Sequence, residues 1–134
     1  MTDFEWPIRI YYEDTDSGGV VYHSNYLNFM ERARTEWLRA LGFEQDVLIE
    51  EYQCLFAVHS MQLQFKRPAR FNDALIVRSH ILNVSGASFE FDQKIFRDGE
   101  LLCDAIVKIA CLDSNRFRPK SIPPSLLTEI QVER

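Results

Sequence analysis

One amphipathic helix, followed by a long run of alternating segments, limits the folds open to this chain. From Ser24 onward, apolar residues recur at i, i+3, i+4 and i+7 and form a single stripe. The stripe consists of Tyr26, Phe29, Met30, Ala33, Trp37 and Leu41. Ser24 or Asn25 is suited to cap the start, and Gly42 to supply the left-handed residue after the end. The pattern predicts a helix of about 17 residues, roughly 25 Å long.

The segments on either side of this helix alternate with the period of two that β-strands show. Before it, "WPIRIYYE" places Ile8, Ile10 and Tyr12 on one face. After it come four further strand candidates, "CLFAVHSMQLQFK", "ALIVRSHILNV", "ASFEFDQKIFR" and "ELLCDAIVKIACLD". Asp98-Gly99 is a strong signal for a two-residue hairpin between the last two of these strands.

The order of the elements predicts the fold class. One strand, one long helix and four antiparallel strands indicate an α+β fold, in which a sheet of about five strands curls around the helix. Residues 44–51 and the end of the chain are expected to add short helical turns. A single helix cannot cover both faces of such a sheet, and the sheet edges stay open. We therefore expect a homo-oligomer that forms by edge-to-edge pairing.

Composition excludes several classes of protein. A chain of 134 residues fits one domain, residues 1–134. The net charge of -5 argues against a nucleic-acid binder, which usually carries a basic excess. Cys54, Cys103 and Cys111 lack metal-ligand spacing and are expected to be reduced, buried thiols. With neither a basic, apolar leader nor an apolar run long enough for a membrane span, the sequence predicts a cytoplasmic protein.

The loop "EDTDSGG" before the helix concentrates carboxylates and glycines, and metal binding is one hypothesis for it. It resembles the start of a calcium loop, but Asn25 stands where that loop needs a bidentate glutamate. Paired aspartates of phosphoryl transfer are a second hypothesis. They usually follow a wholly apolar parallel strand, which is missing here. Both hypotheses are disfavoured, and no metal or other cofactor is expected.

A purely structural interpretation explains part of the same loop. One carboxylate near a helix N-terminus complements the helix dipole, and a glycine permits a tight turn. Glu13, Asp14 and Asp16 together exceed that need, as does the pair Gly18-Gly19. The glycines suit the close approach of a ligand to free backbone N–H groups at the helix start. A structural and a functional loop both remain open on the residues alone.

The stretch from Tyr11 to Gly42 closely resembles a known signature. It is that of the hotdog-fold acyl-CoA thioesterases of the 4-hydroxybenzoyl-CoA thioesterase superfamily, and the Tol–Pal-associated acyl-CoA thioesterases of bacteria match best. Their pattern is Y-x-D-T-D-x-x-G-V-V-Y-H-x-x-Y, followed by a helix with E-R-A-R. Its positions are occupied here by Tyr12, Asp14, Thr15, Asp16, Gly19, Val20, Val21, Tyr22, His23, Tyr26, Glu31, Arg32, Ala33 and Arg34. The strand order and the "RPARFND" turn extend the resemblance along nearly the whole chain.

The resemblance implies a sheet wrapped around the long helix, in dimers that often pair into tetramers. It also implies hydrolysis of an acyl-CoA thioester at a site between two subunits. The family's catalytic acid corresponds to Asp16, as nucleophile or as general base, and both roles stay open. Backbone N–H groups at Tyr22, His23 and Gly19 would hold the oxyanion. The His23 side chain would orient water or donate a proton.

Substrate contacts follow from the chemistry of CoA and from family analogy. The CoA phosphates need cations, and the candidates are Arg67, Arg70, Arg97, Arg116, Arg118 and Lys120. By analogy, the pantetheine arm runs near Ser85, Gly86 and Ser88. Tyr26, together with Tyr12, Tyr22 and Phe29, lines an acyl pocket or belongs to the core. The expected acyl groups are short-chain or aromatic, with acyl carrier protein thioesters as an alternative substrate.

Two other functions compete with thioester hydrolysis. A hotdog-type acyl dehydratase or hydratase has spaced prolines after its catalytic histidine, whereas "SNYLNFME" follows His23. A non-catalytic acyl-carrier-binding module is disfavoured by the intact Asp16 and Gly19. A thioester hydrolase therefore remains the favoured function.

Overall fold

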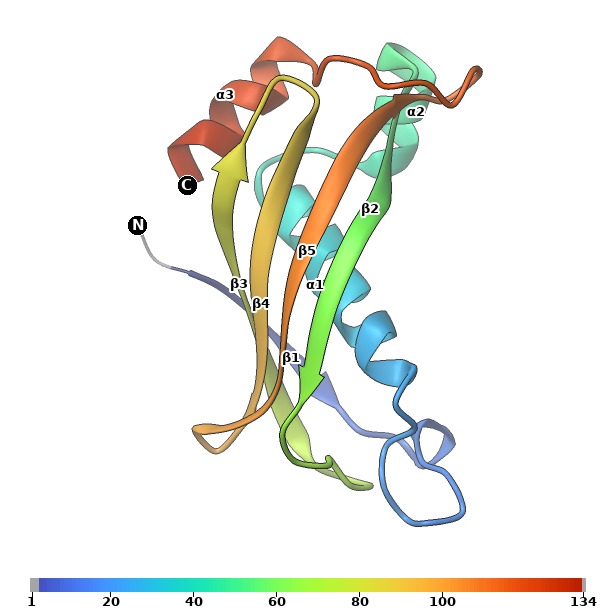
Figure 1. Ribbon diagram of the computed structural model, residues 1–134, viewed down its shortest axis with the longest axis vertical. Coiled ribbons are helices and arrows are strands. Elements are labelled where there is room, and N and C mark those ends of the chain that lie inside the picture. Colours follow the sequence, from blue (N-terminus) through green and yellow to red (C-terminus); the bar gives the residue numbers. More distant parts are fainter. Residues whose placement is uncertain (1–2, 134) are drawn as a thin grey trace.

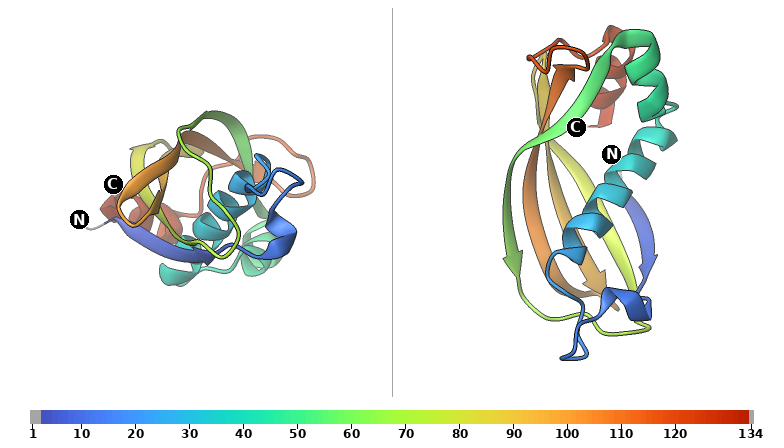
Figure 2. Two further views of the ribbon diagram at one scale, coloured as in Figure 1. Left: turned by 90° about the horizontal axis from the view of Figure 1, so that it is seen from below. Right: turned by 90° about the vertical axis from the view of Figure 1, so that its right-hand side faces the viewer.

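The computed structural model shows a five-stranded antiparallel sheet curved around one long helix, which confirms the expected α+β hotdog arrangement (Figures 1 and 2). It describes residues 3–133, so the first two residues and the last residue of the predicted domain 1–134 lie outside it. The strand order is β1-β3-β4-β5-β2. The strands are β1 (Phe4–Arg9), β2 (Cys54–Phe65), β3 (Ala74–Val84), β4 (Ser88–Arg97) and β5 (Glu100–Asp113). The helices are α1 (Asn25–Ala40), α2 (Gln45–Tyr52) and α3 (Pro124–Glu133), with a 3-10 turn, η1, at Tyr12–Asp14.

Helix α1 forms where the apolar stripe predicts it and has 16 residues. Its stripe is buried against the inner face of the sheet, and Phe29, Met30 and Ala33 are fully inaccessible. Gly42 has φ +96° and follows the end of the helix, as expected. The predicted side-chain cap is wrong. Ser24 occupies the N-cap position without a side-chain hydrogen bond to the helix, and the Asn25 amide instead donates to the backbone oxygen of Asp14 at 3.1 Å.

Strand β1 is shorter than its alternation predicts. Ile8 and Ile10 are buried, but the Tyr12 side chain is 78% exposed and does not continue their face. The Asp14 carboxylate accepts the Tyr11 N–H at 2.8 Å, and the Asp14 N–H donates to the Tyr11 oxygen at 3.0 Å. These bonds close η1 and turn the chain away from the sheet. Tyr12 therefore belongs to neither the core nor an apolar pocket wall of this subunit.

The turns follow their sequence signals. Asp98 and Gly99 both have positive φ, 49° and 80°, which is the conformation of a two-residue type I′ hairpin. The expected terminal helical turns are longer than predicted: α2 has eight residues and α3 has ten. Helix α3 packs near the end of β3 with Leu126 and Ile130 fully buried, because both side chains join the core shared by the sheet and α1.

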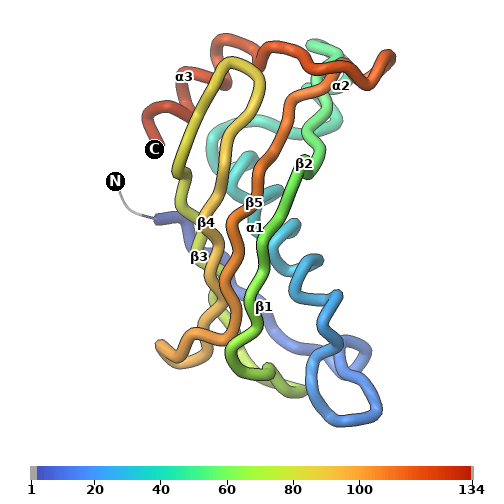
Figure 3. Tube along the Cα trace, in the orientation of Figure 1, coloured from blue at the N-terminus to red at the C-terminus, as the bar shows by residue number. Residues whose placement is uncertain are grey.

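The molecule has two distinct ends along the strand direction, which can be followed along the chain in Figure 3. The loop end holds residues 11–23 and the β2–β3 turn, residues 66–73. The helix end holds α2, α3, the hairpin 85–88 and the segment 114–123. Strand β2 is an edge strand whose described partner is β5. Within the described part of the chain, no helix is long and apolar enough to cross a membrane.

Candidate active site

The acidic loop is a small, closed hairpin. The Asp16 N–H donates to the Val20 oxygen at 2.9 Å, and Thr15 and Val21 form an antiparallel bridge. The Tyr22 N–H donates to the Asp14 oxygen at 3.0 Å and closes the base of the hairpin. The backbone on both sides of the tip is therefore paired, and the loop leads directly into α1.

The Asp16 carboxylate lies at the tip of this hairpin and is exposed. Its Oδ1 accepts the Gly18 N–H at 2.8 Å. A Cβ at residue 18 would lie 3.1 Å from that oxygen, so glycine leaves room for the bond. Oδ2 has no hydrogen-bond donor among residues 3–133. One oxygen thus fixes the carboxylate while the other stays available to a reacting group.

Gly18 and Gly19 both donate their N–H groups within the loop, which reduces the number of N–H groups available to an oxyanion. Gly19 has φ +80°, and its N–H donates to the Asp16 oxygen at 3.0 Å. The Tyr22 N–H is taken by Asp14, as described above. Both predicted donors are therefore engaged in this conformation. The third, the His23 N–H, has no acceptor in the part of the chain that the structure describes.

Asp14 holds the loop together. Its Oδ2 accepts the Tyr11 N–H, and its Oδ1 accepts the Asn25 side-chain amide at 3.3 Å. Its backbone oxygen accepts both the Tyr22 N–H and the Asn25 amide. All three of its oxygens are thus committed to η1, to the base of the hairpin and to the start of α1. This is the pattern of a structural carboxylate, and it differs from that of Asp16.

A hollow of about 240 Å³ opens beside the start of α1. The His23 ring packs 4.5 Å from the Tyr22 ring and meets the Phe65 ring edge-on at 6.4 Å, between centroids. The walls of the hollow are mostly apolar, and its lining includes two cations, Lys66 and Arg67. The lining residues are Val21, His23, Tyr26, Phe65, Lys66, Arg67 and Pro68. The structure thus brings the predicted residues His23, Tyr26 and Arg67 together.

Tyr26 forms the floor of the hollow and anchors its far wall. Its side chain is only 3% exposed, and its hydroxyl oxygen accepts the Ala69 N–H at 2.9 Å. Burial raises the pKa of the Tyr26 phenol above its ordinary value, so the hydroxyl keeps its proton at neutral pH. Tyr26 therefore connects α1 to the 66–73 turn.

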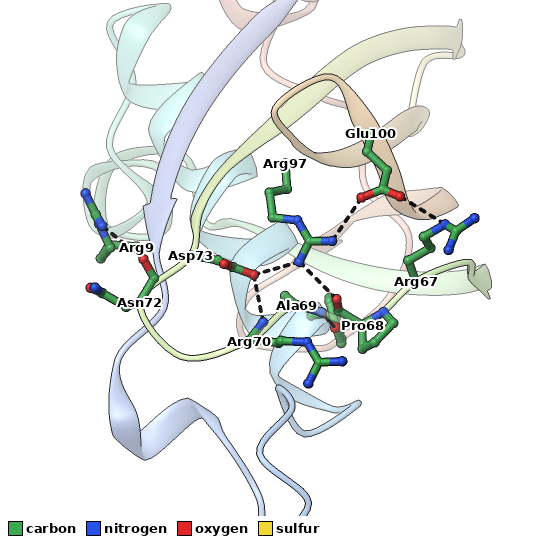
Figure 4. A network of polar contacts seen from close by, with 10 residues as sticks. Arg9, Arg67, Pro68, Ala69, Arg70, Asn72, Asp73, Arg97 and Glu100 are labelled. Carbon is green, nitrogen blue, oxygen red and sulfur yellow. Dashed lines mark hydrogen bonds and ion pairs between the residues drawn. The ribbon is translucent and has the colours of Figure 1, made fainter.

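The predicted CoA-binding cations divide between the two ends of the molecule. Arg67, Arg70 and Arg97 lie at the loop end (Figure 4). Arg67 pairs with Glu100, its Nε lying 3.0 Å from a carboxylate oxygen, and Arg97 pairs with Asp73 at 2.8 Å. The exposed Arg70 guanidinium makes no ion pair within residues 3–133. The remaining candidates, Arg116, Arg118 and Lys120, lie in the segment 114–123 at the helix end.

The residues predicted to contact pantetheine also lie at the helix end. Ser85 and Ser88 bond to each other in the β3–β4 hairpin, with their hydroxyl oxygens 2.8 Å apart. The Gly86 oxygen accepts the Ile122 N–H at 2.8 Å. Within one subunit, the structure does not bring these residues to the hollow. Their polar groups close a turn and fasten the segment 114–123.

Four residues that line the hollow were not predicted as site residues: Val21, Phe65, Lys66 and Pro68. Phe65 and Lys66 end β2 and begin the 66–73 turn. The Phe65 side chain is 50% exposed although it ends an apolar, alternating strand. An aromatic residue directly before Lys-Arg-Pro was the one available signal, because strand periodicity alone cannot show which strand end approaches α1.

Comparisons with known proteins agree with this geometry. A family model of the Thioesterase-like superfamily matches residues 11–130. The acyl-CoA thioesterase YbgC of Haemophilus influenzae is 45% identical over 120 residues, which cover 90% of this chain and 88% of that protein.

Two solved structures share the fold and part of the sequence. A probable thioesterase from Bartonella henselae is 34% identical with a TM-score of 0.87, over 91% of this chain and all of that one. The gentisyl-coenzyme A thioesterase BH1999 is 26% identical with a TM-score of 0.84, over 91% of this chain and 98% of that one. The match over most of the chain identifies this protein as a member of the Thioesterase-like superfamily, a thioester hydrolase with the hotdog fold.

Proposed function

We propose that this protein hydrolyses acyl-CoA thioesters to a free acid and CoA, with Asp16 as the catalytic carboxylate. The observation that carries the proposal is the contrast between the two aspartates of the loop. Asp14 has every oxygen engaged, whereas Asp16 is exposed and one of its carboxylate oxygens has no donor in the described part of the chain. The names of the relatives, which include an acyl-CoA thioesterase, support the same chemistry.

Asp16 acts on the acyl carbon in one of two ways. Its free oxygen attacks the carbonyl directly and forms a mixed anhydride, or it takes a proton from the attacking water. The Gly18 N–H bonded to the other oxygen holds the carboxylate in a fixed orientation. The leaving thiolate is stable enough to depart without a strong general acid.

The oxyanion that develops on the carbonyl oxygen is held by the His23 N–H at the start of α1. This amide has no acceptor among the residues that the structure describes, and N–H groups at a helix start are oriented toward an approaching anion. The His23 imidazole, exposed beside Tyr22 and Phe65, orients the attacking water or protonates the leaving group.

The hollow beside α1 receives the thioester, and the cations of the loop end hold the CoA phosphates. Arg70 is the strongest candidate because its guanidinium is exposed and unpaired in the described structure, whereas Arg67 is shared with Glu100. The aromatic rings of Tyr26 and Phe65 in the walls of the hollow support aromatic or short-chain acyl groups. The name of the gentisyl-CoA thioesterase supports the aromatic choice. Acyl carrier protein thioesters are the alternative substrate.

A second copy of the chain completes the site. Strand β2 has 12 residues and an open edge, and it runs from the helix end to the loop end. Two such edges related by a two-fold axis pair antiparallel, which brings the helix end of one subunit beside the loop end of the other. Ser85, Gly86, Ser88, Arg116 and Arg118 enter the proposal through this second copy. Light scattering should therefore give a mass that is an even multiple of 15.7 kDa.

The experiment that tests the function is a thiol-release assay across a series of acyl-CoAs, from acetyl to long-chain and benzoyl derivatives. We expect turnover with short-chain or aromatic members and no loss of activity after dialysis against a chelator. The same acyl groups attached to acyl carrier protein are assayed in parallel, to compare the two classes of thioester substrate. Absence of thiol release with every acyl-CoA, or release restored only by one divalent ion, would contradict the proposal.

A further inference from the structure

The Arg9 guanidinium of β1 holds one side of the 66–73 turn by donating to the Asn72 oxygen at 3.0 Å. The Arg97 guanidinium of β4 makes more contacts with the turn (Figure 4). Its Nη1 lies 2.8 Å from the Asp73 carboxylate and donates to the Pro68 oxygen at 3.2 Å. Its Nη2 donates to Glu100 at 2.9 Å. Asp73 also accepts the Arg70 N–H at 2.8 Å through the same Oδ2. These contacts hold both halves of the turn against β4.

The backbone of the 66–73 turn supports the acidic loop. The Val21 N–H donates to the Ala69 oxygen at 2.8 Å, and Val20 forms an antiparallel bridge with Arg70. The Ala69 N–H donates to the Tyr26 hydroxyl at 2.9 Å. Val20 and Val21 lie between Asp16 and His23 in the sequence. The position of both proposed catalytic groups therefore depends on where residues 69–70 are held.

We propose that Arg97 and Asp73 form a latch that positions Asp16 and His23 for the reaction. Neither latch residue touches the substrate, so both act through the 66–73 turn and the acidic loop. The inference rests on the proposed function of Asp16 and His23. It predicts an effect on kcat, because a small displacement of reacting groups is costly in rate.

The charge state of the latch is stable at neutral pH. Partial burial alone would raise the pKa of the Asp73 carboxyl, but the hydrogen bonds and charges of Arg97 and Arg70 outweigh it and place that pKa below its ordinary value. A carboxyl with a lowered pKa contributes stability above its unfolded-state pKa and loses it as the pH falls through the folded-state value. The latch thus opens only under acidic conditions.

Asp73→Ala removes both acceptor interactions and tests the latch directly. We expect kcat to fall by about tenfold, because Asp16 and His23 are no longer held in position. Asp73→Asn restores an acceptor and should recover part of the loss. The matched control is Glu5→Ala, which breaks the remote Glu5–Arg78 ion pair of 3.0 Å between β1 and β3 and should leave kcat unchanged.

Two further readouts separate positioning from simple loss of stability. In an Asp16→Asn background, Asp73→Ala should cost less in residual kcat than it does in the wild type, because one of the two groups that it positions is already missing. Amide hydrogen exchange at Val21 should accelerate in Asp73→Ala and not in Glu5→Ala. If Asp73→Ala fails to fold, Arg97→Lys keeps a cation with fewer donors and should give a smaller change in the same direction.

Several results would overturn the latch. They are an unchanged kcat despite faster exchange at Val21, unchanged exchange at Val21, and an equal loss of kcat with and without Asp16. A wild-type protein that releases no thiol from any acyl-CoA would overturn the proposed function instead, and the exchange measurement would still decide whether the latch holds the loop.

A different observation concerns two buried thiols at the helix end. Cys54 begins β2 and Cys111 lies near the end of β5, with their sulfur atoms 2.9 Å apart. Both are buried, with exposures of 1% and 0%. The hydrogen bond from Cys54 lowers the pKa of the Cys111 thiol, while the same bond and burial raise that of Cys54. The third thiol, Cys103, has a pKa raised by burial to about 12 and has no sulfur partner in the described chain.

We infer that Cys54 and Cys111 form a reversible disulfide when the protein meets hydrogen peroxide. One S–S bond forms as the two thiols lose two protons and two electrons, and the peroxide is reduced to two waters. The segment 114–123 lies against the pair, because the Cys111 sulfur is 3.9 Å from the Ser121 oxygen and the Lys120 N–H donates to the Cys111 backbone oxygen at 2.9 Å. Local opening of that segment admits the oxidant. The bond would then tie the edge strand β2 covalently to β5.

Peroxide titration followed by intact mass and thiol counting tests this inference. We expect a mass loss of two hydrogens, retention of one thiol, reversal by dithiothreitol, and a melting temperature raised by at least about 5 °C. Cys103→Ser should behave as wild type, whereas Cys54→Ser and Cys111→Ser should show no such loss. Oxygen addition without loss of hydrogen, or a disulfide that forms only in denaturant, would overturn it.

Discussion

The two ends of the molecule are held in different ways. At the helix end, Leu126, Ile130 and Ile122 are buried, and the hairpin hydroxyls of Ser85 and Ser88 bond to each other. At the loop end, backbone hydrogen bonds and the Arg97–Asp73 pair carry the structure, and among residues 3–133 the Asp16 Oδ2 and the His23 N–H have no hydrogen-bond partner. The hairpin hydroxyls of the helix end are therefore engaged within their own turn. An end fastened through its backbone leaves side chains free to react.

Among the tests of this difference between the two ends, the largest expected effect is a loss of stability at the helix end. Leu126→Ala removes a fully buried side chain and should lower the free energy of unfolding by about 2–5 kcal/mol in urea titrations. We expect kcat below the melting range to change by less than about twofold. Val132→Ala on the same helix is the control, because the Val132 side chain is 59% exposed and should cost less than about 0.5 kcal/mol. A large, specific loss of kcat in Leu126→Ala would break the division between the ends.

A smaller effect is expected in substrate affinity at the loop end. Arg70→Ala removes the free guanidinium and should raise KM for an acyl-CoA by about tenfold, the scale of one charge-assisted hydrogen bond, with little change in kcat. The same acyl group on pantetheine, which lacks the nucleotide phosphates, should show no such increase. An equal rise in KM with the pantetheine substrate would mean that Arg70 does not bind phosphate.

The smallest effect is expected for the predicted substrate residues at the helix end. Arg118→Ala and Ser85→Ala should each raise KM by no more than about twofold, because Ser85 is engaged by Ser88 and Arg70 is the proposed main contact of the phosphates. Arg118→Ala and Arg70→Ala are matched variants, because both replace an arginine by alanine and differ only in position. A larger increase in KM for Arg118→Ala would assign the phosphates to the helix end of the partner subunit.

The fold was predictable because its signals are local. The stripe of α1 and the turn residues Asp98 and Gly99 fix their elements through periodicity and backbone preference. The end of β1 was not predictable in the same way. There the Asp14 side chain competes for backbone N–H groups and closes a 3-10 turn at Tyr12, so that the alternation stops early.

The site was predictable only where the signature lies. Asp16 and His23 were named from the motif, and the sequence could not tell which N–H groups of the loop are engaged. The Arg97–Asp73 pair joins residues 24 apart on different elements, and no pattern in the sequence links them. The division of six candidate cations between two ends also follows from topology alone, since exposed arginines look alike in a sequence.

The central claim is that Asp16 performs the chemistry while Asp14 holds the loop. The most direct measurement compares purified Asp16→Asn with Asp14→Asn in kcat on the best acyl-CoA and in melting temperature. Asp16→Asn should lower kcat by at least about a hundredfold with little change in melting temperature. Asp14→Asn should lower kcat by about tenfold or less and reduce the melting temperature, because it weakens the bonds to Tyr11 and Asn25. Near-wild-type turnover in folded Asp16→Asn, or a greater loss of kcat in Asp14→Asn, would contradict the account.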